Sequence, residues 1–230
     1  FEEAVMIYDE YFGACALDVA DLDSDGDLDI VVLAWHRLSV LLNNGDGTVT
    51  WGGYYGPFAG PVLGGDIDIT HLDSDEFLDV IVSAGEGMGT NTVFTLLGNG
   101  DGSFDITGPG WLDGIGPFTH VIAEDFDLDG YNDAFFCGVD GLLAIMLNSG
   151  DGLLIEPLEF ESNSAASQQG VVADFDSDGD FDFAYVSDLP GPYYWQIRVH
   201  LNKLNPQDIE GSEETSSSIQ LLASPSPFSS

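Results

Sequence analysis

Short hydrophobic runs bounded by turn residues recur along the whole chain. In the first unit they cover residues 14–20, 29–35, 38–43 and 48–52, and they are rich in Val, Leu, Ile and aromatic residues. Gly, Asn and Asp separate the runs, and no window sustains the 3.6-residue period of an amphipathic helix. The pattern therefore predicts an all-β protein built of short strands, with almost no helix.

An internal repeat groups these strands. Four Asp-rich segments align with one another and begin their loops at Asp21, His71, Asp125 and Asp174, about 50 residues apart. A weaker Gly-Asp-Gly turn follows the first three, in LLNNGDGTV (41–49), LLGNGDGSF (96–104) and IMLNSGDGLL (145–154). Four-stranded units at this period are typical of β-propeller blades, in which each small sheet packs against its neighbours.

We expect a β-propeller of four-stranded blades over residues 1–204, followed by a Ser-rich linker or tail over 205–230. The last unit ends after its third strand, so residues 1–8 are a candidate for the strand that closes a four-bladed ring. The alternative is that the four units are part of a larger propeller. The repeats lie near residues 14–52, 66–107, 118–160 and 169–203.

The Asp-rich loops have the spacing of a calcium site, D-x-D-x-D-G-x-x-D. Alternate carboxylates converge when the chain curls, the Gly allows a sharp bend, and the seventh residue offers its carbonyl. Carboxylates this close repel one another unless a cation lies among them. Ca²⁺ suits such a set better than Mg²⁺, which holds its waters. The expected ligands in the first, third and fourth loops are Asp21, Asp23, Asp25, Asp27 and Asp29; Asp125, Asp127, Asp129, Tyr131 and Asp133; and Asp174, Asp176, Asp178, Asp180 and Asp182, with Asp27, Tyr131 and Asp180 binding through their carbonyls.

The second loop departs from the pattern, with His71 at its first position and Glu76 where Gly is wanted. Imidazole suits Zn²⁺ or Cu²⁺ better than Ca²⁺, and a non-Gly residue in the left-handed conformation costs roughly 1–2 kcal/mol. We therefore expect a fourth, degenerate calcium site, weaker than the other three, whose ligands are Asp73, Asp75, Asp79 and the carbonyl of Phe77.

The composition limits the kinds of partner that the chain can bind. The chain has 41 acidic and three basic residues, for a net charge of −38, which excludes a surface that follows nucleic-acid or membrane phosphates. Its 44% of hydrophobic residues supplies a core, and no apolar run is long enough to span a bilayer. Phe1 in place of an initiator Met indicates a mature form or a fragment. Cys15 and Cys137 are expected to be small buried hydrophobic residues, with their pairing left open.

Strand parity divides the loops between two ends of the sheets. The Asp-rich loops and the Gly-Asp-Gly turns share one end, and the opposite end gathers aromatic residues together with a few charged ones. Aromatic rings are suited to stacking on sugars and to anchoring protein contacts. We expect this end to bind a protein or glycan ligand, although the same rings could instead pack between the sheets. The candidates are Trp35, Arg37, Trp51, Tyr54, Tyr55, Glu86, Trp111, Tyr193, Tyr194 and Trp195.

The motifs DLDSDGDLD (21–29), DFDLDGYND (125–133) and DFDSDGDFD (174–182), with the LLNNGDGT-type turns, resemble the FG-GAP/VCBS repeats, whose calcium loops also occur in integrin α propellers. The resemblance covers about residues 1–203. It implies a secreted or surface-displayed protein that serves adhesion or glycan binding, or a non-catalytic part of a larger protein; rings in the family commonly have more than four blades. Separately, LLASPSPFSS (221–230) faintly resembles the start of a type IX secretion sorting domain.

No catalytic constellation stands out in the chain. It contains no G-x-S-x-G elbow, no H-E-x-x-H motif and no P-loop, and its four histidines fall in separate units. We therefore expect no enzyme activity and favour a calcium-stabilised extracellular binding propeller. The alternatives are a structural repeat segment of a larger secreted protein and an accessory part of a polysaccharide-active enzyme.

Overall fold

The computed structural model describes residues 13–34, 37–56, 62–86, 90–113, 118–138, 141–155, 157–161, 169–188 and 195–202. Within these ranges the chain forms fifteen strands in four antiparallel sheets and no helix. The prediction of an all-β protein is therefore confirmed. In this part of the chain no helix has the length and apolar character needed to cross a membrane.

Each sheet is built from consecutive strands in chain order. Sheet 1 contains β1 (Ala14–Ala20), β2 (Asp29–Ala34), β3 (Arg37–Asn43) and β4 (Val49–Tyr55). Sheet 2 contains β5 (Val62–Thr70), β6 (Asp79–Glu86), β7 (Thr90–Gly98) and β8 (Phe104–Asp113). Sheet 3 contains β9 (Phe118–Glu124), β10 (Asp133–Gly138), β11 (Leu142–Met146) and β12 (Leu158–Glu161). Sheet 4 contains β13 (Gly170–Ala173), β14 (Asp182–Asp188) and β15 (Trp195–His200).

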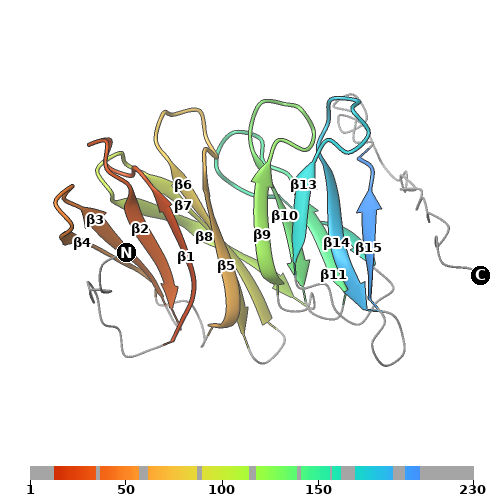
Figure 1. Ribbon diagram of the computed structural model, residues 1–230, viewed down its shortest axis with the longest axis horizontal. Helices are drawn as coiled ribbons and strands as arrows, with labels where there is room; N and C mark the ends of the chain where they lie inside the picture. Colours follow the sequence, from red (N-terminus) through yellow and green to blue (C-terminus); the bar gives the residue numbers. More distant parts are fainter. Residues whose placement is uncertain are drawn as a thin grey trace, which may run out of the picture.

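The four sheets lie side by side in a row, with sheets 1 and 4 at opposite ends of the molecule (Figure 1). The first strands of successive sheets are neighbours, in the order β1, β5, β9 and β13. The last sheet has three strands among the described residues, as its sequence predicts. The described sheets form an open row; residues 1–8, the predicted closing strand, are not among the described residues.

Three hydrophobic layers join the sheets, one for each pair of neighbours. Between sheets 1 and 2, Val31 and Leu33 pack with Val80 and Leu96, all fully buried. The other two layers are built from residues of sheets 2 and 3 and of sheets 3 and 4 in the same way. The core is thus distributed between the sheets, because each sheet is too small to bury its two faces alone.

The third layer is the most aromatic. The rings of Phe135 in sheet 3 and Phe183 in sheet 4 lie 4.4 Å apart, and the Phe183 ring stacks on His200. Cys137 is buried in the same layer, as predicted, whereas Cys15 is exposed on β1, so that prediction was wrong for Cys15. Both cysteines are free thiols, and burial raises the pKa of Cys137 to about 12.

Candidate metal centres

The four Asp-rich loops connect the first and second strands of their sheets, and we call them loop 1 (21–29), loop 2 (71–79), loop 3 (125–133) and loop 4 (174–182). Positions in each loop are numbered 1 to 9. Position 9 is also the first residue of the second strand, so the loops sit at the same end of every sheet. In Figure 1 these connections lie along the upper side of the row.

The carboxylate at position 9 is buried and ties the loop to the rest of its sheet. In loop 1, Asp29 accepts hydrogen bonds from the backbone N–H of Leu22 and of Asn43, both at 2.8 Å. The same pair of bonds recurs at Asp79, Asp133 and Asp182, each to position 2 and to the end of the third strand. Position 9 therefore has a structural role in addition to any metal, one that sequence reasoning did not anticipate.

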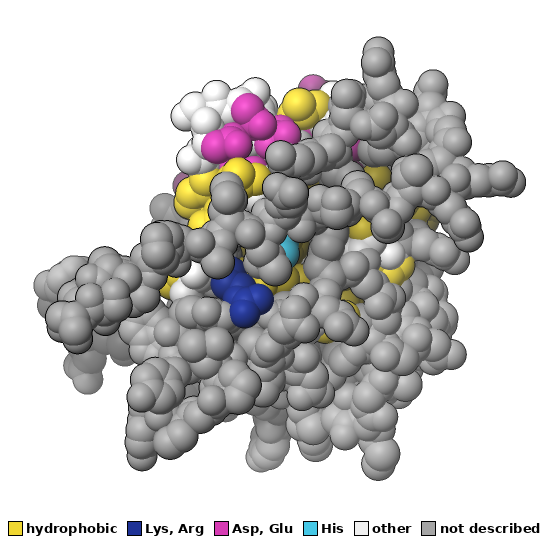
Figure 2. Space-filling model, turned by 90° about the vertical axis from the view of Figure 1, so that its right-hand side faces the viewer, with side chains coloured by type: hydrophobic (Ala, Val, Ile, Leu, Met, Phe, Trp, Pro, Cys, Tyr) yellow, Lys and Arg dark blue, Asp and Glu magenta, His cyan; other side chains and the backbone are white. Residues whose placement is uncertain are grey.

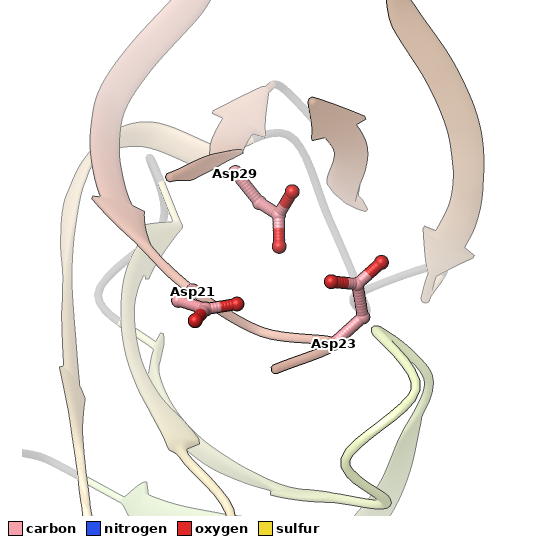
Figure 3. A group of neighbouring side chains, drawn as sticks. All are labelled: Asp21, Asp23 and Asp29. Carbon is pink, nitrogen blue, oxygen red and sulfur yellow. The ribbon is translucent and has the colours of Figure 1, made fainter. Parts of the chain in front are cut away.

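Three of the loops gather carboxylates around a common point. In loop 1 the side chains of Asp21, Asp23 and Asp29 point toward one another (Figure 3), and each offers an oxygen within 4.8 Å of the other two. Loops 3 and 4 form the same group from positions 1, 3 and 9. Among the described residues, loop 2 forms no such group. The predicted ligands at these three positions are thus brought together in three loops.

The carboxylate at position 5 lies outside these groups. Asp25 and Asp129 accept a hydrogen bond from the backbone N–H of position 7, at 2.9 Å in both loops. Position 1 is held in a similar way, because its carboxylate accepts the N–H of the Gly at position 6, at 3.1 Å in loop 1 and 3.0 Å in loop 3. Each carboxylate is therefore oriented by the backbone before any ion arrives.

The backbone of loops 1, 3 and 4 follows one path. Their position 6 glycines have φ between 96° and 101°. Position 4 is left-handed as well, at Ser24, Leu128 and Ser177 with φ of 60–65°. No residue of loop 2 has a positive φ, so Glu76 does not adopt the strained conformation expected of it. Loop 2 therefore avoids that strain by taking a different path.

Loop 2 closes on itself through its histidine. His71 Nδ1 lies 2.8 Å from the carbonyl oxygen of Phe77, and since a carbonyl only accepts, the imidazole N–H is the donor. That carbonyl is the oxygen predicted to bind the fourth ion. The side chain at position 1 therefore bonds the position 7 oxygen directly, which removes the need for a cation between the two.

Burial and mutual repulsion make several carboxylates of loops 3 and 4, inside and beside the converging groups, reluctant to ionise without a cation. Burial, followed by the charge of Asp127, raises the pKa of Asp133 to about 7, although two backbone N–H groups favour its charged form. Burial also raises the pKa of Asp180 to about 7, with Asp178 contributing next. Burial and the neighbouring Asp129 raise the pKa of Asp127. A bound cation would stabilise the charged form in each loop.

The donor set in loop 1 fits Ca²⁺. The buried Oδ1 atom of Asp21 has no hydrogen-bond partner among the described residues, and Asp21 belongs to the converging group. The group contains only carboxylate oxygens, which are the ligands of a hard cation. A cation at this point would supply the partner that the Asp21 oxygen lacks.

The following sheet covers loops 1, 2 and 3 from one side. The carbonyl of position 2 accepts a hydrogen bond from the next sheet: Gly102 N–H to Leu22 at 3.2 Å, Asn148 Nδ2 to Leu72 at 2.6 Å, and Asn202 Nδ2 to Phe126 at 2.7 Å. The sequence carries a signal for this contact, because an Asn ends the third strand in three of the four units. The carboxylate groups of loops 1 and 3 therefore lie beside the contacts that join neighbouring sheets.

The structure describes only some of the residues predicted to bind a ligand. Trp51 and Tyr54 are exposed on β4, but Trp51 pairs with Leu41, which pairs with Ile30 beside loop 1, so the predicted place of Trp51 at the opposite end was wrong. Tyr55 packs edge-on against Phe104 and accepts its N–H at 3.0 Å, between sheets 1 and 2. Arg37 lies over the ring of Tyr54, at 5.3 Å. Glu86, Trp111 and Trp195 belong to β6, β8 and β15 by their backbone; Trp35, Tyr193 and Tyr194 lie outside the described residues.

Comparison with known families supports the repeat. A family model described as an FG-GAP-like repeat matches residues 125–185, a segment that contains loops 3 and 4 and the strands β10, β11 and β12 of sheet 3. The resemblance noted in the sequence is therefore confirmed over this segment. A comparison with curated proteins finds no match.

Proposed function

We propose that this FG-GAP repeat protein is a calcium-stabilised, non-catalytic recognition module that works outside the cell or on its surface and binds a protein or glycan. The repeat match supports the class of module, and the loops support the metal. Its sheets would act as propeller blades. The observation that carries the calcium assignment is the buried, unpartnered oxygen of Asp21, which lies in a group of three convergent carboxylates.

Calcium would act on the fold rather than on a reaction. The ions would sit in loops 1, 3 and 4, where carboxylates of positions 1, 3 and 9 meet and where the next sheet contacts loops 1 and 3. A ligand that binds only the native state stabilises it by about 2.7 kcal/mol per site when its concentration is a hundred times its dissociation constant. Three such sites would make the stability of the row strongly dependent on calcium.

Calorimetric titration of the calcium-stripped protein tests this assignment. We expect about three ions per chain, with Mg²⁺ binding more weakly. Asp23→Asn, at position 3 of loop 1, should remove one ion, whereas Asp73→Asn, at position 3 of loop 2, should leave the stoichiometry unchanged. The two variants are matched in position and chemistry. Loss of an ion from the Asp73 variant alone, or no calcium binding by the wild type, would refute the proposal.

A candidate ligand surface lies on the outer strand of sheet 1. The rings of Trp51 and Tyr54 are 6.5 Å apart, with Arg37 over the face of Tyr54. They share one side of β4 because a β-bulge at Gly52 shifts the register: Leu41 pairs with Trp51 and Val40 with Gly53. Two exposed rings with an adjacent cation offer stacking surface and a hydrogen-bond donor, as sugar rings and protein anchors require.

Binding of the calcium-loaded protein to a glycan array and to extracellular protein panels tests the recognition role. Trp51→Ala and Tyr54→Ala should each reduce capture at least tenfold, while Leu158→Ala, another exposed apolar position on an outer strand, should not. Equal capture by all three variants would exclude this surface. The triple substitution of Tyr193, Tyr194 and Trp195 by Ala tests the rest of the predicted ligand set in the same assay.

A further inference from the structure

The contact between neighbouring sheets is built in the same way three times along the row. Each sheet turns one face toward the preceding sheet, which we call its N-side face, and the other toward the following sheet, its C-side face. In sheet 1 the C-side face includes Val31, Leu33 and Val40, which pack against sheet 2. Pairing places Leu17 opposite Val32, and Val19 opposite Ile30, on the N-side face.

Among the described residues, no sheet packs on the N-side face of sheet 1, unlike the N-side faces of sheets 2, 3 and 4. Leu17 corresponds by repeat position to Ile67 in sheet 2 and to Val121 in sheet 3. Ile67 is 6% exposed and Val121 3%, because the preceding sheet covers them, whereas Leu17 is 69% exposed. Val19 is exposed beside it. The first sheet therefore presents an apolar face of the kind that packs against another sheet.

The C-side face of sheet 4 is open in the complementary way. Position 2 of the loops is buried at Leu22, Leu72 and Phe126, under the next sheet, but Phe175 in loop 4 is 46% exposed. On the same side, Val186 and its cross-strand partner Ile197 are exposed, the latter at 66%. Figure 2 looks onto this end of the molecule and shows hydrophobic side chains close to the acidic ones.

The polar groups that join neighbouring sheets elsewhere in the row lack these contacts at the two ends. Asn148 donates both to a carbonyl of its own sheet and to Leu72 of the preceding sheet, whereas its counterpart Asn43 donates to Leu28 of its own sheet. Among the described residues, no donor bonds the carbonyl of Phe175. In the described part of the chain, one N–H of the Asn43 amide thus has no acceptor in sheet 1, where the Phe175 carbonyl in sheet 4 has no donor.

The glycine turns show the same difference. A Cβ on Gly102 would lie 2.5 Å from Leu42 of the preceding sheet, and one on Gly152 would lie 2.5 Å from Leu97. The equivalent Gly47 of sheet 1 has nothing within 4 Å of that point. The turn of sheet 1 is therefore shaped for a leucine that it does not contact.

We propose that two copies of this chain associate head to tail, the N-side face of sheet 1 in one copy packing on the C-side face of sheet 4 in the other. The two ends are the separate halves of an apolar contact that the chain itself makes three times, with the bond from Asn and the contact of the glycine turn each made twice. The surfaces differ from one another, so the contact is heterologous and leads either to a closed ring or to an open chain of copies. Two faces of the same kind would not reproduce this register.

The net charge of −38 opposes the association at low salt. Counterions and calcium should therefore favour it. The contact leaves Trp51 accessible, because Ile106, which occupies the position of Trp51 in sheet 2, is exposed although sheet 1 packs on that face. Association and ligand binding at Trp51 are thus compatible.

Sedimentation velocity of the full chain at 150 mM salt with millimolar calcium tests the proposal. We expect association that increases with protein concentration from the micromolar range upward. Leu17→Asp and Ile197→Asp should each shift the equilibrium to monomer by at least tenfold. Both positions are exposed, so both variants should fold, which circular dichroism checks. Ile155→Asp, an exposed position of sheet 3 away from both end faces, is the matched control and should associate like the wild type.

Mixing the two variants gives the decisive result. Leu17→Asp keeps an intact C-side end and Ile197→Asp an intact N-side end, so an equimolar mixture should form a dimer that neither forms alone. A monomeric wild type at all concentrations, as when other segments cover the ends, would overturn the proposal. So would an oligomer insensitive to both variants, or one abolished by only one of them, because the latter indicates contact between two identical faces.

Discussion

The imidazole of His71 donates a hydrogen bond to the carbonyl oxygen of Phe77, with Nδ1 and the oxygen 2.8 Å apart. In the other three loops an Asp stands at the position of His71. Together with Glu76 in place of Gly, this replacement separates a loop held by its own side chain from three loops whose carboxylates converge. Loop 2 serves as an internal reference for the metal assignment, since it shares the scaffold and lacks the converging group.

Restoring the shared pattern should create a fourth calcium site. The double variant His71→Asp/Glu76→Gly removes the bond to Phe77, adds a carboxylate at position 1 and lets position 6 adopt a positive φ. Calorimetric titration should show one more bound ion than the wild type. An unchanged stoichiometry would mean that the path of loop 2 is set by more than these two residues.

The position 9 carboxylate should stabilise the fold even where no metal binds. Asp79→Ala leaves the buried N–H groups of Leu72 and Gly98 without an acceptor, and hydrogen bonds to a charged group contribute about 1.5–3 kcal/mol each. We expect urea unfolding to show that the free energy of unfolding falls by about 3 kcal/mol or more, and by the same amount in calcium and in EDTA. Asp73→Ala, which removes one exposed acceptor from the same loop, should cost less than about 1 kcal/mol. A loss for Asp79→Ala that appears only in calcium would contradict this role.

A pair of equivalent glycines should report the contact between sheets. Gly102 and Gly47 both have positive φ, of 76° and 86°, so alanine adds roughly 1–2 kcal/mol of strain at either. At Gly102 the new methyl group also meets Leu42 of sheet 1, which must shift. Unfolding of dilute protein should therefore show that Gly102→Ala costs about 1 kcal/mol more than Gly47→Ala. Equal losses would indicate that Leu42 moves aside freely.

A histidine between the first strands should make stability depend on pH. In β9, Nδ1 of His120 lies 2.5 Å from Oδ2 of Asp66 in β5, and Nε2 lies 3.2 Å from the carbonyl oxygen of Gly170 in β13. The hydrogen bond to Asp66 is the main cause that raises the pKa of His120, against the opposing effect of burial. The unfolded histidine titrates near pH 6.5. The stabilisation is therefore fully present below that pH and is lost as pH rises through the folded pKa.

Thermal unfolding of the wild type and His120→Gln between pH 6 and 9, in saturating calcium, measures this contribution. The wild type should lose more stability over that range than the variant, which keeps a neutral hydrogen-bonding side chain. Burial raises the pKa of Asp68 to about 6. Asp68 therefore changes the stability mainly between about pH 4, near its unfolded pKa, and pH 6, below the tested range. Parallel curves for the two proteins would show that the His120–Asp66 pair does not contribute.

Local patterns in the sequence predict the strands and the loops, because both depend on residues close together in the chain. Hydrophobic runs place β1 and β2 to within a residue, and the Asp spacing finds the three converging groups. The bond from His71 to Phe77 is different, since the replacement of Asp by His shows that a ligand is lost but not what takes its place.

Contacts between repeats also cannot be predicted from local patterns in the sequence. The exposure of Leu17, beside the burial of Ile67 at the same repeat position, depends on which sheets have neighbours. The bond from Asn148 to Leu72 joins residues 76 positions apart. The Asn is visible in the sequence, but its acceptor follows only from the packing of sheet 3 on sheet 2.

Anomalous diffraction from crystals grown with millimolar calcium is the most direct test of the metal assignment. We predict one peak in each of loops 1, 3 and 4, among the carboxylates of positions 1, 3 and 9, with no peak in loop 2. Loops 1, 3 and 4 without anomalous density at that concentration, or a peak between His71 and Phe77, would contradict the account.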